Sequence, residues 1–523
     1  MIKITYKLIL LLSLLAMTVT SFAASEAEYG KVSKAWTLHA DGSQEYRSSM
    51  ELTLFTHTAM NSTYGESFIV YNPDFQTLKI HSSYTRQKDG TIVKTPDNAF
   101  VEVLPRFAAD APAYNQLKEM VVVHTGLELG ATIYLDYSII TKPGYYPALD
   151  INERLQETSP VKECKVSISV PEGTPLACGL YGSPVKAVEE SHDGIKEVHW
   201  TLRNIPASSR EAFQPKNREA SPHLVASTYP SGKAALATLD KRLKESQGYE
   251  SKTFAQFLTD KSGNEQEKVN IIRDHILNNL STCPIPMAMT GYTVRDIDTV
   301  LRSAYGTPLE IAQLLNVMLN AAGIPSEVLA VYPGHLDTDA CGLAAIQTLA
   351  VKATVDGKDQ YLSASPLTNR GGLDKVVSLS GTSIEIETTP IQIKESRSVA
   401  ISADQAKDGF AICVLPAISA GIDSWGMSAL NSKRSNLFEL PSLIREEVTP
   451  AEGMKLQTST KEQVISKPFG KVTRTITPRG NTIEVVRTIE LNKQQFTPAE
   501  YSDVRSLIHE WTNPDNRVLL FSL

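Results

Sequence analysis

The chain has 523 residues, and its 51 lysine and arginine residues against 58 aspartate and glutamate residues give a formal net charge of −7 at pH 7. This mild acidity argues against nucleic acid or an anionic membrane surface as a partner. The length exceeds what one hydrophobic core organises, so several domains are expected. Five cysteines in so long a chain do not make a disulfide scaffold, and an odd number leaves at least one unpaired in a monomer.

The first residues have the pattern of a secretory signal peptide. Lys3 and Lys7 precede the apolar run Leu8–Val19, and small residues follow, so cleavage is expected after Ala23. The apolar run is shorter than the about 20 residues that a membrane-spanning helix needs, and no later segment reaches that length. Residues 1–23 are therefore predicted to be removed, and the mature chain to be exported to the periplasm or the cell exterior without a membrane span.

Residues 24–232 are rich in predicted strands that turn sequences separate. Several of these strands alternate apolar and polar residues, which is typical of a sheet with one buried face. The clearest are Ser67–Tyr71, Gln76–Ser83, Thr91–Val93, Ala131–Ile140, Lys165–Val170 and Lys196–Leu202. This pattern predicts a large antiparallel β-sandwich.

Residues 233–384 combine helices with a β-hairpin. Asn264 and Glu267 predict the start of an amphipathic helix, and the Asp356-Gly357 turn predicts a hairpin of Leu349–Val355 with Gln360–Ala364. His275 has no second histidine or cysteine at metal-binding spacing, so no metal is predicted. The chain also lacks a glycine-rich phosphate loop and a nucleophile elbow, and no cofactor is expected.

The most informative stretch runs from Arg302 to Val331. Thr307 is placed as an N-cap, Pro308 suits the first helical position, and Glu310 stands where it completes a capping box. The helix Leu309–Ala322 should follow, and then a strand over Glu327–Val331.

This stretch resembles the core of bacterial transglutaminase-like domains, which belong to a papain-like superfamily. Their pattern is glycine, any residue, cysteine, any residue, acid, then a helix rich in alanine and leucine, Ala-Gly-Ile and a strand. Gly306, Glu310 and Ala322-Gly323-Ile324 fit this pattern, but Pro308 stands at the position of the nucleophilic cysteine. The resemblance therefore implies the fold without its thiol.

The resemblance also implies a histidine base at the head of one hairpin strand and an acid near the end of its partner. The histidine position falls on Thr348, or on Gln347 if the register slips by one residue, and the acid position falls on Ser363. Pro308, Thr348 and Ser363 are predicted to converge at one cleft as the remains of a lost catalytic triad.

A cysteine elsewhere in the chain is the alternative candidate for the nucleophile. Cys341 precedes the hairpin, with His335 six residues upstream as a base, although no helix N-terminus or basic neighbour is evident to activate it. Cys341 could equally be a small buried residue, or form a disulfide bond with Cys283, since sequence does not assign connectivity.

The loop Ser281–Val294 borders the substrate cleft in the family that the sequence resembles. Met287, Met289 and Tyr292 from this loop, together with Glu310, are therefore candidates to line the cleft. Ordinary loop packing is the other interpretation of the loop residues, because methionine readily fills irregular gaps.

Residues 385–523 are predicted to form strands, with one helix near the end of the sequence. The clearest strands are Ser383–Glu387, Phe410–Leu415, Lys471–Ile476 and Thr482–Leu491, and the helix is expected over Tyr501–Trp511. This part resembles the small β-sandwich-like domain that closes three-part bacterial envelope proteins. The first segment resembles the uncharacterised β domain that precedes transglutaminase-like domains, through Asp41-Gly42-Ser43, Ser159-Pro160-Val161 and Val170-Pro171-Glu172-Gly173.

The sequence therefore predicts an α+β multidomain protein with a β-sandwich, a transglutaminase-like domain and a C-terminal β domain. One functional interpretation is a non-catalytic binding or scaffolding module of the cell envelope, with a peptide, a glycan or a protein as its ligand. The other is a hydrolase or acyl-transferase of the cysteine-protease kind that uses an unplaced nucleophile such as Cys341.

Overall fold

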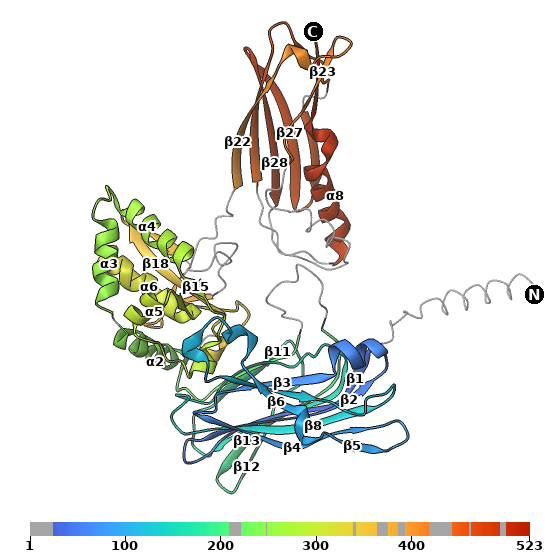
Figure 1. Cartoon of the computed structure of the whole chain (residues 1–523), viewed down its shortest axis with the longest axis vertical. Coiled ribbons are helices and arrows are strands. Elements are labelled where there is room, and N and C mark those ends of the chain that lie inside the picture. Colours follow the sequence, from blue (N-terminus) through green and yellow to red (C-terminus); the bar gives the residue numbers. More distant parts are fainter. Residues whose placement is uncertain are drawn as a thin grey trace, which may run out of the picture.

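The computed structural model describes residues 25–208, 221–246, 248–337, 341–362, 375–384, 393–417, 442–459, 462–491 and 498–523. The predicted signal peptide at residues 1–23 lies outside these ranges. Figure 1 shows three bodies along the chain: a strand-rich one in blue to green, a mixed helix and sheet body in green to yellow, and a strand-rich one in orange to red. No helix within the described ranges is long and apolar enough to cross a membrane.

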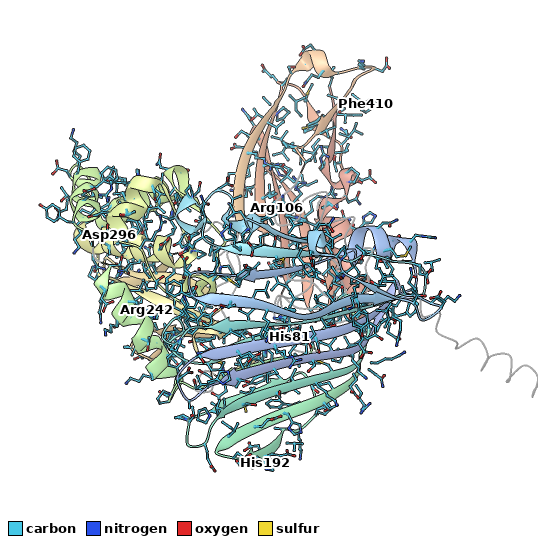
Figure 2. The ribbon with its side chains drawn as sticks, turned by 60° about the horizontal axis from the view of Figure 1, so that its bottom comes forward. His81, Arg106, His192, Arg242, Asp296 and Phe410 are labelled. Carbon is cyan, nitrogen blue, oxygen red and sulfur yellow. The ribbon has the colours of Figure 1, made fainter. Side chains whose placement is uncertain are left out.

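An eight-stranded sheet dominates the first body, and Figure 2 shows it broadside with His81 on it. Its strand order is β12 (Val188–His192), β13 (Ile195–Ile205), β10 (Val161–Pro171), β1 (Ala27–Leu38), β2 (Gln44–Leu54), β8 (Thr132–Thr141), β4 (Gln76–Arg86) and β5 (Ile92–Lys94). All neighbours are antiparallel except β1 and β10, which pair in parallel. The prediction of a purely antiparallel arrangement is wrong at this pair, because the long connection between the two strands allows a parallel crossover that a short hairpin does not.

Two three-stranded sheets complete the first body. One contains β3 (Glu66–Tyr71), β7 (Lys118–Val123) and β6 (Phe100–Val103), and the other contains β11 (Ala177–Tyr181), β14 (His223–Ser227) and β9 (Asp150–Arg154). Every residue of β14 is buried, because Leu224 and Ala226 enter the core of the first body while Val225 enters the core of the second. Successive side chains of a strand point to opposite faces, so β14 joins the two cores.

The second body places helices on one sheet. Its helices are α2 (Gly232–Glu245), α3 (Glu250–Thr259), α4 (Glu265–Asn279), α5 (Ile297–Ser303) and α6 (Pro308–Ala321). Its five-stranded sheet has the order β19 (Lys358–Leu362), β18 (Thr348–Val355), β17 (Ser326–Tyr332), β20 (Lys375–Ser378) and β21 (Ser383–Ile384). The most deeply packed helix is α6, which buries Leu309, Ile311, Leu314 and Met318. Figure 2 labels Arg242 and Asp296 on this body.

The local signals that predicted these elements are confirmed. Asn264 caps α4, and Thr307 and Glu310 form both halves of the capping box of α6. Val355 pairs with Lys358 across a two-residue turn whose φ angles are 48° at Asp356 and 75° at Gly357, as a type I′ hairpin requires. The predicted loop over residues 281–294 holds a short strand, β15 (Ser281–Thr282), and a 3₁₀ turn, η5 (Met287–Thr290).

The third body packs one helix on a five-stranded sheet. The sheet order is β22 (Ile393–Ile401), β24 (Ser442–Pro450), β28 (Thr482–Leu491), β27 (Gly470–Arg479) and β26 (Glu462–Lys467). Helix α8 (Tyr501–Thr512) covers it with the buried residues Val504, Leu507, Ile508 and Trp511. A smaller sheet has the order β23 (Phe410–Val414), β29 (Val518–Ser522) and β25 (Lys455–Leu456), and Phe410 of its edge strand is labelled in Figure 2.

Candidate functional site

A cavity of about 760 Å³ lies between the first and the second bodies. The first body contributes strand residues, among them Trp36, Glu45, Tyr46, Tyr137, Asp150, Asn152 and Glu153. The second body contributes the loop from Pro284 to Tyr292, the start of α6 and the segment from Leu343 to Leu349. The cavity is thus a feature of the pair of bodies, because each supplies one wall.

Two of the three predicted triad positions lie in this cavity. Pro308, the first residue of α6, and Thr348, the first residue of β18, both line it. Gln347, the alternative histidine position, lines it as well. Ser363 lies outside the described residues.

The loop residues proposed to line the cleft also face the cavity. Met287, Met289 and Tyr292 all line it. The loop is held from the first body, where the Tyr145 hydroxyl donates to the Met289 carbonyl at 2.8 Å. Gly291 and Tyr292 both have left-handed backbone, with φ values of 59° and 60°. A Cβ atom on Gly291 would lie 2.7 Å from the Tyr145 ring, so glycine is required for this close approach.

Glu310 is the exception, because it does not line the cavity. It lies beneath the cavity wall with 0% of its surface exposed. Its carboxylate accepts from the Thr307 backbone N–H at 2.8 Å, from the Tyr114 hydroxyl at 2.7 Å and from Arg295 Nε at 2.8 Å. Burial alone raises the pKa of Glu310, but the hydrogen bonds from Arg295, Tyr114 and Thr307 lower it below its usual value. The expectation that Glu310 lines the cleft is therefore wrong, since its oxygens already bind internal donors.

This cluster ties the first body to α6. Tyr114 belongs to the short 3₁₀ turn η4 (Pro112–Tyr114) of the first body, and Arg295 lies 5.4 Å from its ring and 4.6 Å from that of Tyr305. The Tyr305 hydroxyl accepts from the Ala113 backbone N–H at 2.8 Å. The acid of the sequence motif thus anchors the interface that encloses the cavity.

Cys341 has the surroundings of a packed residue and not of a nucleophile. Its side chain is 1% exposed, and it does not belong to the cavity lining. Burial, and then the charges of Asp150 and Asp337, raise the pKa of the thiol to about 12. The thiol donates to the Asp337 carbonyl at 3.0 Å. His335 packs its ring 5.9 Å from those of Tyr181 and His223.

The five cysteines are free in the structure. Cys283 contacts the Asp110 carbonyl at 3.8 Å and packs with Ala108, Tyr114 and Ile285, whereas Cys341 belongs to the core of the second body. The disulfide bond considered between Cys283 and Cys341 is therefore not formed.

Two polar residues on β9 were missed by sequence reasoning. The Asp150 carboxylate accepts from the Ala344 backbone N–H at 2.9 Å, and Asn152 Nδ2 donates to the Ala344 carbonyl at 2.7 Å. The backbone N–H and carbonyl of one residue in the second body are thus both bound by one strand of the first. Gly342 allows the approach, since a Cβ atom there would lie 2.1 Å from Asp150 Oδ1.

Asp150 is the most perturbed acid of the cavity wall. Burial raises its pKa to about 7, although the backbone N–H groups of Ala344 and Leu343 oppose the shift. Its Oδ1 atom is buried and has no hydrogen-bond partner within the described part of the chain. No local sequence signal marked this residue, because its surroundings come from a segment almost 200 positions away.

The lining decides which chemistry the cavity supports. None of the described residues that line it is cysteine, serine or histidine, and its hydroxyl groups belong to threonine and tyrosine. It also contains no lysine or arginine among those residues, but it contains three carboxyl groups. Within the described ranges no three histidine, cysteine, aspartate or glutamate residues gather as metal ligands would. The described lining residues thus provide apolar, aromatic and carboxyl surfaces.

Two domain families of unknown function match the chain. The DUF3857 model matches residues 40–209, and the DUF3858 model matches residues 410–521. Both are described as domains of unknown function with a solved structure. No curated protein matches the chain.

Among solved structures, the crystal structure of a putative protease from Parabacteroides distasonis ATCC 8503 is 98% identical, covers 95% of this chain and 99% of its own, and has a TM-score of 0.87. A putative cysteine protease from Cytophaga hutchinsonii is 15% identical over 44% of this chain and 78% of its own, with a TM-score of 0.20. An M1 zinc metallopeptidase from Deinococcus radiodurans is 11% identical over 38% of this chain and 42% of its own, also with a TM-score of 0.20. Scores this low establish no shared fold.

Proposed function

The chain belongs to the family of the Parabacteroides distasonis protein and carries its DUF3857 and DUF3858 domains, and from this premise we propose that it is a non-catalytic binding module of the bacterial cell envelope. The proposal includes a transglutaminase-like central domain over residues 233–384 that has lost its catalytic triad. It also includes export, directed by the signal peptide at residues 1–23. The ligand site is the cavity between this domain and the N-terminal domain at residues 24–232, while residues 385–523 form a C-terminal domain.

The observation that carries the proposal is the composition of the cavity wall at the two triad positions. A proline at the start of α6 and a threonine at the start of β18 line the cavity, and no cysteine, serine or histidine joins them among the described lining residues. An acyl-transfer enzyme needs a nucleophile and a base within hydrogen-bond reach of each other. The cavity retains a ligand-sized volume without either group.

The first test concerns turnover. The purified mature protein should not cleave peptide amides or esters and should not transfer amines, and alkylation of its thiols should change nothing. Pro308→Cys should stay inactive, because a nucleophile without a placed base and acid is not activated. Turnover that Cys341→Ala abolishes would support the alternative of a cysteine-dependent hydrolase.

The second test concerns binding. Trp36 lines the cavity, so its fluorescence should change when a ligand binds. The Trp36→Phe variant shows how much of the fluorescence change comes from this residue. Ala148 also lines the cavity, so Ala148→Phe should fill it and remove the response to peptide or glycan ligands. Ala237→Phe on the exposed face of α2 is the matched control and should bind normally. A ligand response that Ala148→Phe leaves unchanged would place the binding site elsewhere.

A further inference from the structure

The cavity between the two domains has an unusual balance of charge. Glu45, Asp150 and Glu153 line it, and the described lining residues include no basic side chain. Lys34 neutralises part of this charge, but it is shared between Glu153 and Glu157 and so leaves one negative charge in that group. Cavities lined by one sign of charge concentrate ligands of the opposite sign.

Two groups of aromatic rings accompany these carboxyl groups in the cavity lining. Trp36, Tyr46 and Tyr137 form a row on the eight-stranded sheet, with centroids 5.2 Å and 6.2 Å apart. Tyr146 and Tyr292 form the second group and meet edge to face, with centroids 6.4 Å apart. Aromatic faces attract organic cations, and the attraction increases when water is excluded.

Asp150 acts electrostatically on Tyr292 and gives this second group an incompletely used acceptor. One carboxyl oxygen accepts from the Ala344 backbone N–H, and the Leu343 backbone N–H also acts on the carboxyl. Oδ1 is buried against Gly342, belongs to a side chain that lines the cavity, and makes no hydrogen bond of good geometry within the described part of the chain. A buried acceptor without a donor costs free energy, which a ligand donor would recover.

We propose that this cavity binds an aliphatic primary ammonium group, with the Asp150 carboxylate as its counter-ion and Tyr146 and Tyr292 as its aromatic neighbours. The inference rests on the proposed binding function and specifies its ligand class. A lysine side chain or a comparable amine presents such a group on an apolar stem, which suits the methionine and proline residues of the opposite wall.

The groups around Asp150 determine the charge that this cation would meet. Tyr229, Tyr292, Tyr332 and Cys341 lie within electrostatic reach of the carboxyl, and burial raises the pKa of each, so all are neutral at pH 7. Arg242 of α2 acts on Tyr229 and Tyr292, while its guanidinium donates to the Gly291 carbonyl.

Binding should release a proton. The free Asp150 carboxyl has its pKa raised to about 7 by burial, and a bound ammonium group stabilises the ionised form. The Asp150 proton passes to the buffer, and the carboxylate then pairs with the ligand cation. Affinity should therefore rise about tenfold from pH 6 to pH 8, and release should approach one proton per ligand at pH 6 and none at pH 8.

The experiment uses the purified mature chain and two matched probes, Nα-acetyl-lysine methylamide and Nα-acetyl-norleucine methylamide. Calorimetry in two buffers with different ionisation enthalpies measures affinity and protons released together. The lysine probe should bind at least about tenfold more tightly than the norleucine probe at pH 8, since only the former pairs with a carboxylate. Asp150→Asn should remove this preference and the proton release, whereas Asp274→Asn on α4, outside the cavity lining, should change neither.

Several outcomes would overturn the inference. Equal binding of the two probes, or tighter binding of a neutral N-acetylglucosamine oligomer than of the lysine probe, would refute the ammonium site while leaving the binding function intact. Absence of lysine-probe binding at millimolar concentration would refute it as well. If Trp36 fluorescence still responded to another ligand, the proposed binding function would stand without the ammonium site. If Asp150→Asn does not fold, the proton release of the unmodified protein decides between the outcomes.

Discussion

Glu310 and Glu446 are both completely buried glutamates that pair with an arginine, but their surroundings shift the carboxyl pKa in opposite directions. The pKa of Glu310 is lowered. The pKa of Arg295 is raised, because its hydrogen bonds with Glu310 outweigh the effect of burial, which lowers it. Burial raises the pKa of Glu446 and lowers that of Arg487. The same type of ion pair is therefore favoured at the cavity interface and disfavoured inside the C-terminal domain.

The number of donors explains the difference. Glu310 accepts from Arg295, from the Tyr114 hydroxyl and from the Thr307 backbone N–H. Glu446 accepts from Arg487, whose Nη2 atom lies 2.7 Å from both carboxylate oxygens, while Arg397 Nη1 lies farther away, at 4.0 Å. A buried charge is stabilised when hydrogen bonds satisfy all its lone pairs, and one ion pair seldom balances the loss of hydration.

The largest expected effect is that of Arg487→Met. It leaves Glu446 buried without its main partner and should destabilise the C-terminal domain by about 3–5 kcal/mol. Denaturant midpoints followed by Trp511 fluorescence measure it. Arg445→Met on the same sheet is the control, because the Arg445 side chain is 57% exposed and its pair with Glu484 should contribute little.

The cost of Arg487→Met should depend on pH with a defined sign. The pKa of Glu446 is raised in the folded protein, so its contribution is fully present below the unfolded value of about 4.3 and is lost as pH rises through the folded value. The variant should accordingly recover part of its stability on acidification from pH 7 to pH 5. A cost that stays constant over this range would contradict the assignment of a poorly solvated carboxylate.

Tyr114→Phe should have a smaller effect at the other pair. It removes one hydrogen bond to a charged carboxylate, at a cost of about 2 kcal/mol, while Arg295 and Thr307 still satisfy Glu310. The folded pKa of Glu310 is lowered, so this cost should be present at neutral pH and vanish as pH falls through the folded value. Tyr134→Phe on β8 of the eight-stranded sheet is the control, and an equal loss in both variants would show that ring packing matters more than the hydrogen bond.

Thr307→Ala should cost about 1 kcal/mol through the loss of the side-chain cap on α6. The Thr307 backbone N–H still donates to Glu310, so the ion pair should keep its lowered carboxylate pKa. Thermal unfolding measures the stability, and titration of the variant by NMR measures the pKa. A large rise of that pKa would mean that the cap, and not the number of donors, maintains the charge.

The smallest expected effect is that of Pro308→Cys. It should lower stability by about 0.5–1 kcal/mol, because the unfolded chain regains backbone freedom that proline restricts. The measurement is again the unfolding midpoint, and Pro308→Ala serves as a control for the loss of the ring. An unchanged midpoint would mean that the proline acts on the shape of the cavity wall and not on the helix start.

Local signals predicted the parts of this fold that depend on neighbouring residues. The cap of α6, the cap of α4 and the type I′ turn at Asp356-Gly357 need only a few adjacent side chains, and the sequence displays them. β1 and β2 were not recognised. Their place at the centre of the eight-stranded sheet comes from pairing with β10 and β8, which no short window reveals.

The same contrast between local and distant determinants applies to the candidate site. Pro308 and Thr348 could be placed because each opens an element whose boundary the sequence indicates. The burial of Glu310 and the position of Asp150 could not, because Tyr114 and Ala344 act on them from 196 and 194 positions away in the chain. Sequence reasoning therefore found cavity-lining residues in one domain, while the wall supplied by the other domain emerged only from the structure.

The parallel pairing of β1 with β10 has a consequence for the order of assembly. β1 lies in the middle of the sheet with β2 on one side and β10 on the other, yet β10 begins only at Val161. Until that residue has left the ribosome, one edge of β1 has open backbone donors and acceptors. Such an edge can pair with foreign strands. The first domain should thus be most vulnerable to aggregation during its own synthesis, and a chaperone that shields residues 27–38 should improve its yield more than one that acts on the finished chain.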